Sequence, residues 1–215
     1  MLINLYLKNN ILQTGVMMIK NIVFDIGNVL LTFKPRKYLE TLGFSEEMQE
    51  RIYMEIFESD EWVELDKGTL TEEMAIEKFC ERAQDISDEI RLTMKYWKSM
   101  LEPIEETAEI LKKLLEDGYR VYFLSNFHRE AYSEVYEKYD FLQIGSGKVI
   151  SYEINCIKPE EKIYKELLEK YDLIPEETIF IDDSLANIEM AEKLGIKGIW
   201  FLDPEGLRIS LEEYI

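Results

Sequence analysis

The chain has 215 residues, 47% of them hydrophobic, which suits one domain with a smaller insert and allows a sizeable buried core. Its 44 acidic and 25 basic residues give a formal net charge of −19, which argues against a nucleic-acid partner and against an anionic membrane surface, because both attract clustered Lys and Arg. The two cysteines, Cys80 and Cys156, form no CxxC pair and are typical of reduced thiols, so we expect a cytoplasmic protein.

The first segment, residues 1–16, is predicted to be an extension that precedes the folded domain. Polar residues interrupt its apolar stretches, so it has neither the continuous core of a membrane span nor the pattern of a signal peptide. Met17 and Met18 stand directly before the first predicted strand. This leads to the hypothesis that the extension results from a misplaced start codon.

The next stretch predicts one strand followed by a long helical region. Residues 20–25 predict a buried strand, because a continuous apolar run ends there at Asp25. Residues 34–102 carry several amphipathic helical patterns and no strand pattern. Within them, Thr69 and Glu72 have the spacing of a capping box, which predicts the start of a helix.

After Pro103, helical and strand patterns alternate. Helices are expected over Ile104–Asp117, Arg129–Tyr139 and Pro159–Tyr171 and just before Gly195, and strands over residues 119–126, Val149–Tyr152, Thr178–Asp182 and Lys197–Phe201. Such alternation predicts an α/β fold, a Rossmann-like parallel sheet with helices on both faces. Residues 34–102 would then be an inserted all-helical cap, and residues 17–33 and 103–215 the core.

Polar residues stand where the predicted strands end. In an open parallel sheet, ligands bind beyond the carboxyl ends of the strands. Each polar group taken alone could be a helix cap, a turn or a solvated side chain, but the set in this order predicts one site. Its members are Asp25, Ser125 with Asn126, Lys158 ahead of a helix, and Asp182, Asp183 and Ser184.

Four segments that carry these residues resemble the motifs of the haloacid dehalogenase superfamily, whose members are mostly phosphatases. They are VFDIGNVL, FLSN, KP with its following helix, and FIDDSLANIEMA, in that order. The helical insert after the first motif is similar to the small helical cap of that family, and LDKGTLTEE (residues 65–73) looks like part of such a cap. The resemblance covers roughly residues 19 to 203.

The resemblance implies a role for each residue. Asp25 would be the nucleophile that forms an aspartyl-phosphate, which divides one difficult step into two. Neutralisation of charge on the phosphoryl group would come from Lys158, with Ser125 and Asn126 holding its oxygens. A Mg²⁺ cofactor would be bound by Asp25, the backbone carbonyl of Gly27 and Asp183, with Asp182 as a ligand or a partner of the ligands, and Asn187 would steady the Asp183 loop. The implied substrate is a small phosphorylated metabolite.

Gly27 departs from the pattern of family phosphatases, which usually have DxD. The second aspartate protonates the leaving group, and such acid–base help is worth about 100- to 10,000-fold in rate. Glycine retains the backbone carbonyl for the metal but lacks the carboxyl. The first motif, DIGNV, resembles a subgroup with DLGNV that includes a sugar-1-phosphate phosphatase, whose anomeric leaving oxygen needs less protonation.

Two other interpretations stay open. A metal-independent 2-haloacid dehalogenase also lacks the second aspartate because halide needs no proton, but retention of Asp182 and Asp183 argues against it. The other alternative is a non-catalytic phosphate-binding or regulatory module. Neither the substrate nor the oligomeric state follows from the sequence.

The only histidine, His128, lies two residues after Asn126. One hypothesis is that it replaces the missing acid, since histidine suits proton transfer at neutral pH. The alternative is that it is a polar residue that begins a helix. The aromatic residues Trp62, Tyr96 and Trp97 are predicted to be core residues or contacts between the cap and the core.

Overall fold

The computed structural model describes residues 18–215. The predicted extension, residues 1–16, and the hypothesis of a later start therefore lie outside the described residues. Among the helices that are described, none combines the length and the hydropathy needed to cross a bilayer.

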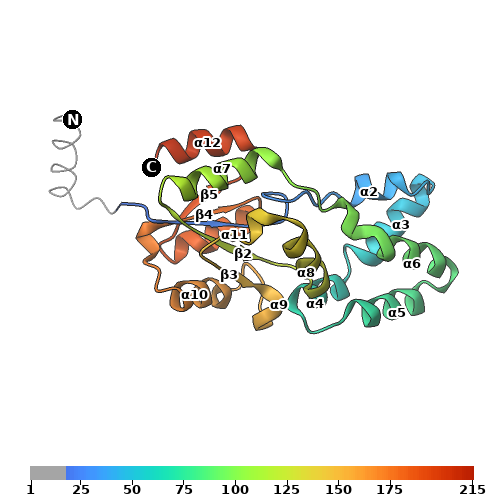
Figure 1. Cartoon of the computed structure of the whole chain (residues 1–215). Coiled ribbons are helices and arrows are strands. Elements are labelled where there is room, and N and C mark those ends of the chain that lie inside the picture. Colours follow the sequence, from blue (N-terminus) through green and yellow to red (C-terminus); the bar gives the residue numbers. More distant parts are fainter. Residues whose placement is uncertain (1–17) are drawn as a thin grey trace, which may run out of the picture.

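Five parallel strands form the central sheet, in the order β3-β2-β1-β4-β5 (Figure 1). Their bounds are β1 Asn21–Phe24, β2 Arg120–Ser125, β3 Gly147–Ile150, β4 Thr178–Asp182 and β5 Lys197–Trp200. At the centre, Phe24 of β1 lies beside Phe123 of β2 on one side and Ile181 of β4 on the other. Because the strands are parallel, the residues that follow β1, β2 and β4 emerge next to one another at one edge of the sheet.

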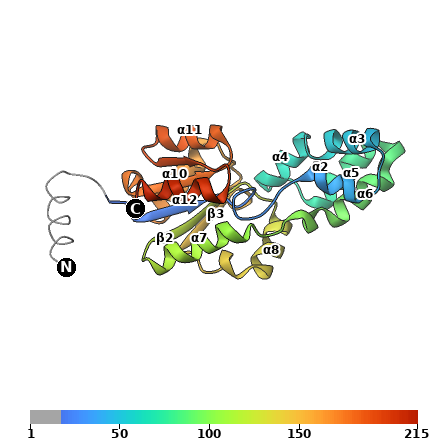
Figure 2. The same ribbon diagram turned by 90° about the horizontal axis from the view of Figure 1, so that it is seen from above.

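The segment between β1 and β2 begins with a non-helical loop, residues 25–34, and then carries a series of helices. Its elements are α2 Pro35–Thr41, α3 Glu46–Ile56, α4 Asp60–Lys67, α5 Glu72–Arg82, η1 Gln84–Ile86, α6 Ser87–Tyr96, η2 Trp97–Met100 and α7 Glu105–Glu116. Residues 35–100 form a separate helical lobe beyond the carboxyl edge of the sheet (Figure 1, Figure 2). No strand occurs in this described segment, as the sequence predicted.

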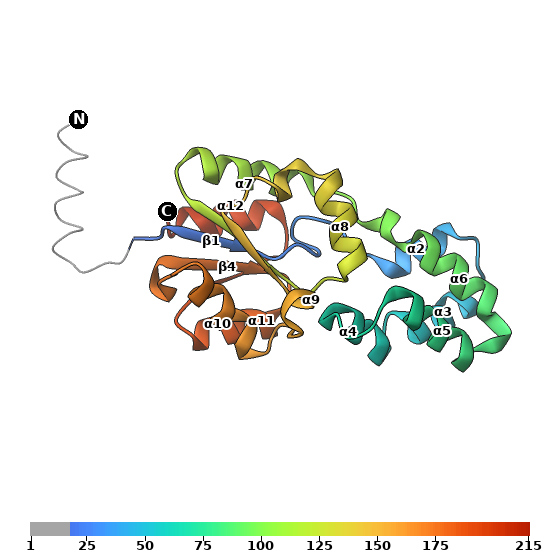
Figure 3. The ribbon, with the colours of Figure 1, turned by 60° about the horizontal axis from the view of Figure 1, so that its bottom comes forward.

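Helices cover both faces of the sheet (Figure 3). Side chains alternate along β1, so that Ile22 and Phe24 pack on one face and Val23 on the other. The first face is covered by α7, α8 (Arg129–Lys138) and α12 (Pro204–Glu212), and the second by α10 (Glu161–Lys170) and α11 (Leu185–Lys193). The predicted Rossmann-like α/β fold is therefore confirmed.

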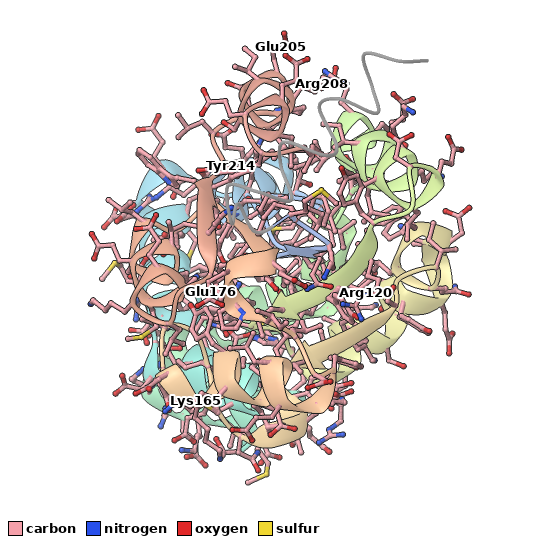
Figure 4. The ribbon with its side chains drawn as sticks, turned by 90° about the vertical axis from the view of Figure 1, so that its left-hand side faces the viewer. Arg120, Lys165, Glu176, Glu205, Arg208 and Tyr214 are labelled. Atoms are coloured by element: carbon pink, nitrogen blue, oxygen red, sulfur yellow. The ribbon has the colours of Figure 1, made fainter. Side chains whose placement is uncertain are left out.

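The edge of the sheet opposite the helical lobe holds the starts of the strands. Figure 4 looks at this edge and shows Arg120, the first residue of β2, and Glu176, which lies just before β4. Glu205 and Arg208 of α12 project outward above them. The polar residues predicted to form a site follow the other ends of β1, β2 and β4, so they lie on the side of the lobe.

The predicted capping box is wrong. The cap of α5 is Thr71, whose side-chain oxygen accepts a hydrogen bond from the backbone N–H of Met74 at 3.3 Å. The hydroxyl of Thr69 instead donates to the carbonyl of Glu64, near the end of α4. Thr69 is used there because Gly68, with φ of 67°, ends α4 in the left-handed conformation and turns the chain back.

Two further expectations differ from the structure. Pro159 does not open a helix: it lies in a turn closed by a hydrogen bond from the N–H of Glu160 to the carbonyl of Ile157, and α10 begins at Glu161, two residues after Pro159. The strand expected over 149–152 ends at residue 150, where the short helix α9 (Ser151–Ile154) begins. The last helix, α12, had no counterpart in the sequence-based prediction.

The aromatic residues of the lobe separate into two groups. Trp62 and Trp97 are buried and pack against each other with ring centroids 5.0 Å apart, as predicted for core residues. Tyr96 is 47% exposed, so its predicted place in the core is wrong. It is the last residue of α6, where the helix face turns toward solvent.

Candidate active site

Asp25 directly follows the central strand β1 and lies almost out of reach of solvent, with 7% of its surface exposed. Its Oδ1 accepts hydrogen bonds from the backbone N–H of Ile26 at 2.7 Å and from Lys158 Nζ at 2.8 Å. Burial, together with the nearby charge of Asp182, raises the pKa of Asp25, and the ion pair with Lys158 opposes that rise. This carboxylate is thus fixed by its neighbours, with one oxygen engaged.

Lys158 lies between two carboxylates. Its Nζ is 2.8 Å from Asp25 Oδ1 and 2.6 Å from Asp182 Oδ2. Burial acts to lower the pKa of Lys158, but the charges of Asp182 and Asp25 outweigh it and raise the pKa, so the ammonium group stays protonated. A fixed positive charge beside Asp25 is suited to hold an anionic phosphoryl group.

Asn126 fixes the backbone of Lys158. Its Oδ1 accepts from the backbone N–H of Lys158 at 2.7 Å, and its Nδ2 donates to the carbonyl of the same residue at 3.1 Å. The Asn126 amide therefore ties the end of β2 to the loop before α10. Ser125 is buried at the end of β2, where its hydroxyl donates to the carbonyl of Asn126 at 3.4 Å and its nearness to Asp25 lowers the pKa of that carboxyl.

The two aspartates after β4 have different surroundings. Asp182 is fully buried, and its carboxylate accepts from Lys158 Nζ, from Ser184 N–H at 2.8 Å and from Asn187 Nδ2 at 2.9 and 3.1 Å. Asn187, which was predicted to steady the Asp183 loop, thus binds the carboxylate of the adjacent Asp182. The carboxylate of Asp183 is only partly buried and accepts from Asn28 Nδ2 at 3.1 Å.

The acidic residues of the site have the composition of a hard-metal site. Asp25, Asp182 and Asp183 each offer a carboxylate oxygen, and these oxygens lie within 4.8 Å of one another. Oxygen ligands of this kind fit Mg²⁺, which keeps several waters and binds few carboxylates. Because the oxygens of Asp182 are already engaged, Asp25 and Asp183 are the better ligands, and Asp182 orients Lys158.

The loop after β1 is shaped by Asn28. This residue has φ of 54°, its Oδ1 accepts from the backbone N–H of Phe33 at 3.0 Å, and its Nδ2 reaches Asp183. At the neighbouring Gly27, no atom of the described residues other than its two chain neighbours lies within 4 Å of the place where a Cβ would stand. Lack of space therefore does not explain the missing carboxyl.

A cavity of about 180 Å³ opens between this loop and the helical lobe. Its apolar wall is formed by Phe33, Trp62, Trp97, Leu101 and Phe127. Asp25, Asp66 and Asp183 are the carboxyl-bearing residues in its lining, and Asp66 is the one supplied by the lobe. Such a cavity below 300 Å³ suits a small ligand rather than a drug-sized one.

His128 lies in the same wall, between two indole rings. Its ring centroid is 4.3 Å from that of Trp62 and 5.1 Å from that of Trp97, and its Nε2 is 3.5 Å from Asp66 Oδ1. Burial, with a smaller effect of Lys98, lowers the pKa of His128 to about 3, so the imidazole is neutral at neutral pH. Neither ring nitrogen has a hydrogen-bond partner in the described part of the chain.

The sequence-predicted residues of the four motifs are brought together at one edge of the sheet. Three residues with contacts at the site were not predicted: Asn28 and Asp66, which line the cavity, and Ser151, whose hydroxyl donates to the carbonyl of Asp66 and accepts from the N–H of Phe127. Asn28 could have been recognised as a residue that tolerates positive φ next to a glycine. A single sequence gives no sign that the carboxyl of Asp66 faces the core, because this depends on how the lobe packs.

Comparisons with known proteins agree with this geometry. Residues 19–195 match the sequence model of the haloacid dehalogenase-like hydrolases. The sesquiterpene phosphatase of Aspergillus oryzae is 24% identical over 200 residues, which cover 91% of this chain and 96% of that protein. The D-ribitol-5-phosphate phosphatase of Bacteroides thetaiotaomicron is 26% identical over 197 residues, 84% of this chain and 90% of that protein.

Solved structures show the same fold. A HAD family enzyme of B. thetaiotaomicron, crystallised with magnesium and inorganic phosphate, has a TM-score of 0.66 and 26% identity, and the match covers 84% of this chain and 93% of that one. The L-2-haloacid dehalogenase of Xanthobacter autotrophicus has a TM-score of 0.63 at 16% identity over 92% of this chain and 84% of that one, which shows the shared fold alone. Since the family model spans most of the sequence and the four motifs meet at one edge of the sheet, the chain belongs to the haloacid dehalogenase-like hydrolase family.

Proposed function

We propose that this protein is a magnesium-dependent phosphatase that hydrolyses a small phosphorylated metabolite through an aspartyl-phosphate on Asp25. The observation that carries the proposal is the arrangement around Lys158, whose buried ammonium group touches both Asp182 and Asp25, the latter a residue that lines a small cavity. Attack on the phosphorus of an anionic phosphate ester requires a nucleophile, here a carboxylate, and a fixed cation beside it that offsets the negative charge of the phosphoryl oxygens. The similar enzyme that was crystallised with magnesium and phosphate, and the two similar phosphatases, support the same activity.

In the proposed reaction, the oxygen of Asp25 that is free of Lys158 attacks phosphorus. Lys158 and the residues after β2 hold the phosphoryl oxygens as their charge develops. Asp25, Asp183 and the backbone carbonyl of Gly27 would hold Mg²⁺, which supplies further neutralisation of the phosphoryl charge when bound. Water then cleaves the aspartyl-phosphate and regenerates Asp25.

We also propose that the helical lobe acts as a cap over this site. Its residues Trp62, Asp66 and Trp97 line the cavity opposite the core, so the lobe both restricts the size of the leaving group and limits access of water. The aromatic wall and the single lobe carboxyl suit a compact leaving group with a hydroxyl and an apolar face, such as a sugar or polyol. The ribitol-phosphate phosphatase is a relative with a substrate of this kind.

The test is phosphate release from p-nitrophenyl phosphate and a panel of sugar and polyol phosphates, with and without Mg²⁺. The Asp25→Asn variant should lose magnesium-dependent turnover, and Asp117→Asn, an exposed aspartate at the end of α7, should retain it. Absence of turnover on every phosphate would refute the proposal and favour a non-catalytic module. Metal-independent release of halide from 2-halo acids would instead favour the dehalogenase interpretation.

A further inference from the structure

Among the described residues, the core side of the cavity offers no carboxyl outside the proposed metal site. The position that usually carries the second carboxyl of a DxD motif is Gly27, and the space beside it is free. Asp25 and Asp183 are engaged by Lys158 and Asn28, respectively, and both belong to the proposed metal site. The remaining carboxyl in the cavity lining is that of Asp66, which comes from the last turn of α4 in the helical lobe.

The backbone of Asp66 is bound directly to the core. Ser151 of α9 donates its hydroxyl proton to the carbonyl of Asp66 and accepts a hydrogen bond from the N–H of Phe127 at 2.9 Å. The next carbonyl, that of Lys67, accepts from Asn155 Nδ2 at 2.8 Å. Ser151 thus ties the end of α4 to the loop that carries Asn126 and His128, which fixes the lobe carboxyl relative to the phosphate site.

The end of α4 also fits closely on the core. At Gly68, a Cβ would lie 2.7 Å from the carbonyl oxygen of Tyr152 and 2.9 Å from its Cα. Only a glycine allows this approach between the lobe and α9 (Figure 3). The position of the neighbouring Asp66 is therefore set by backbone contacts rather than by a flexible side chain.

The side chain of Asp66 lies next to the buried ring of His128 in the cavity wall. Its Oδ1 lies 3.5 Å from Nε2 of His128, a side chain that is 98% buried and has no hydrogen-bond partner among the described residues. An unpartnered imidazole in an indole cage is an unusual and costly arrangement. The imidazole of His128 has a role if the carboxyl of Asp66 gains and loses a proton during the reaction, because the ring contacts that carboxyl.

We propose that Asp66 is the acid–base residue of the reaction and supplies from the lobe the proton transfer that Gly27 cannot. This inference rests on the proposed phosphatase function. In the first step, an Asp25 oxygen bonds to phosphorus, the bond from phosphorus to the leaving oxygen breaks with its electron pair, and the carboxyl proton of Asp66 moves to that oxygen. In the second step, the Asp66 carboxylate takes a proton from water as the water oxygen bonds to phosphorus, and the electron pair returns to Asp25.

The electrostatics of the cavity agree with this assignment. Burial raises the pKa of Asp66 to about 7, the charge of Asp25 adds to the rise, and Lys158 opposes it. A group with this pKa can give a proton in one step and take one in the next at neutral pH. The charge of Lys98 also acts on His128, and Lys98 is itself paired with Glu72 at 3.0 Å. Because His128 is neutral, the hypothesis that it supplies the proton itself is replaced by a positioning role.

The test compares leaving groups in the full-length protein with saturating Mg²⁺. The quantity is kcat/KM, which reports the steps up to cleavage of the bond from phosphorus to the leaving oxygen, for p-nitrophenyl phosphate, phenyl phosphate and an alkyl phosphate. In Asp66→Asn we expect kcat/KM for the alkyl phosphate to fall by about 100- to 10,000-fold, and that for p-nitrophenyl phosphate to change little, because only the alkoxide needs a proton. Asp60→Asn, at the other end of α4, is the matched control and should behave as the unsubstituted protein.

A second variant guards against a purely structural effect. Asp66→Asn combined with Gly27→Asp returns a carboxyl to the free space beside Asp25, and we expect it to recover alkyl phosphate turnover. With the unsubstituted protein, kcat/KM for the alkyl phosphate should decline above about pH 7, and this decline should disappear in Asp66→Asn. An equal loss for all leaving groups, or no loss, overturns the role of Asp66 while leaving the phosphatase intact. Absence of magnesium-dependent turnover in the unsubstituted protein overturns the proposed function itself.

Discussion

The contact between Gly68 and Tyr152 allows a sharp test of how the helical lobe is attached. Gly68 has φ of +67°, and Gly43, which follows α2 in the same lobe, has φ of +74°. Apart from its two chain neighbours, no atom of the described residues lies within 4 Å of a Cβ placed at Gly43, whereas a Cβ at Gly68 meets the backbone of Tyr152 at 2.7 Å. The substitutions Gly68→Ala and Gly43→Ala therefore share a backbone penalty and differ in one contact.

The shared penalty is the cost of a left-handed backbone for alanine, about 1–2 kcal/mol of unfolding free energy. In Gly68→Ala the added methyl group must also move from 2.7 Å to ordinary contact at 3.4 Å, a shift of at least about 0.7 Å against backbone atoms. Such a shift strains the hydrogen bonds from Ser151 and Asn155 to the end of α4, each worth about 0.5–1.5 kcal/mol. We expect Gly68→Ala to be about 1–3 kcal/mol less stable than Gly43→Ala.

The same shift moves Asp66 and the lobe wall of the cavity. A displacement near 1 Å at a catalytic position can lower the rate about 100-fold. We therefore expect Gly68→Ala to lower kcat/KM for phosphate esters by about 10- to 100-fold, and Gly43→Ala to leave it unchanged. Urea unfolding and initial rates with Mg²⁺ measure both effects. If the two variants have the same stability and the same kcat/KM, the lobe is not held by this contact and the reasoning fails.

Three other predictions concern single side chains. Because burial lowers the pKa of His128 from 6.5 to about 3, protonation favours the unfolded state as the pH falls below 6.5. In urea unfolding, the free energy of unfolding should fall by about 2 kcal/mol more between pH 7 and pH 5 than it does in His128→Gln. An equal pH dependence of the two proteins would contradict this prediction. Asn28→Gly keeps the positive φ but removes the hydrogen bonds to Asp183 and from the N–H of Phe33, so magnesium titrations of activity should show about 10- to 100-fold weaker affinity with kcat unchanged at saturation. Lys158→Met leaves the buried carboxylates of Asp25 and Asp182 without their cation. The free energy of unfolding should fall by about 3–5 kcal/mol without metal and by less with Mg²⁺. A loss that is the same with and without Mg²⁺ would argue against a metal site beside these carboxylates.

The elements with strong local patterns could be predicted from the sequence. The strand Thr178–Asp182 was predicted with its observed bounds, because a buried run of apolar residues stops at acidic residues. Element boundaries that are set by tertiary contacts could not be predicted from the sequence. The end of α4 and the start of α5 depend on the fit of Gly68 against Tyr152, so the capping box at Thr69 was assigned two residues too early.

For the site, too, the features that follow from strand pattern and topology could be predicted, and those that depend on tertiary packing could not. Asp25, Lys158 and Asp183 follow strands or precede a helix of a parallel sheet, and topology alone brings such positions together. The different contacts of the two neighbouring aspartates were not predictable, since Lys158 and Asn187 reach Asp182 only in the folded chain. The place of Asp66 depends on the packing of a separate lobe.

A proton donor in the lobe makes the chemistry depend on the position of the lobe. An acid at Gly27 would stay beside Asp25 whatever the lobe did, but Asp66 is at the site only while Ser151 and Gly68 hold α4 on the core. A leaving group too large for the cavity of about 180 Å³ would keep these contacts from forming and would lose its proton donor together with the shield against water. The enzyme would then reject large substrates in the rate of bond cleavage as well as in binding, so discrimination should appear in kcat and be strongest for poor leaving groups.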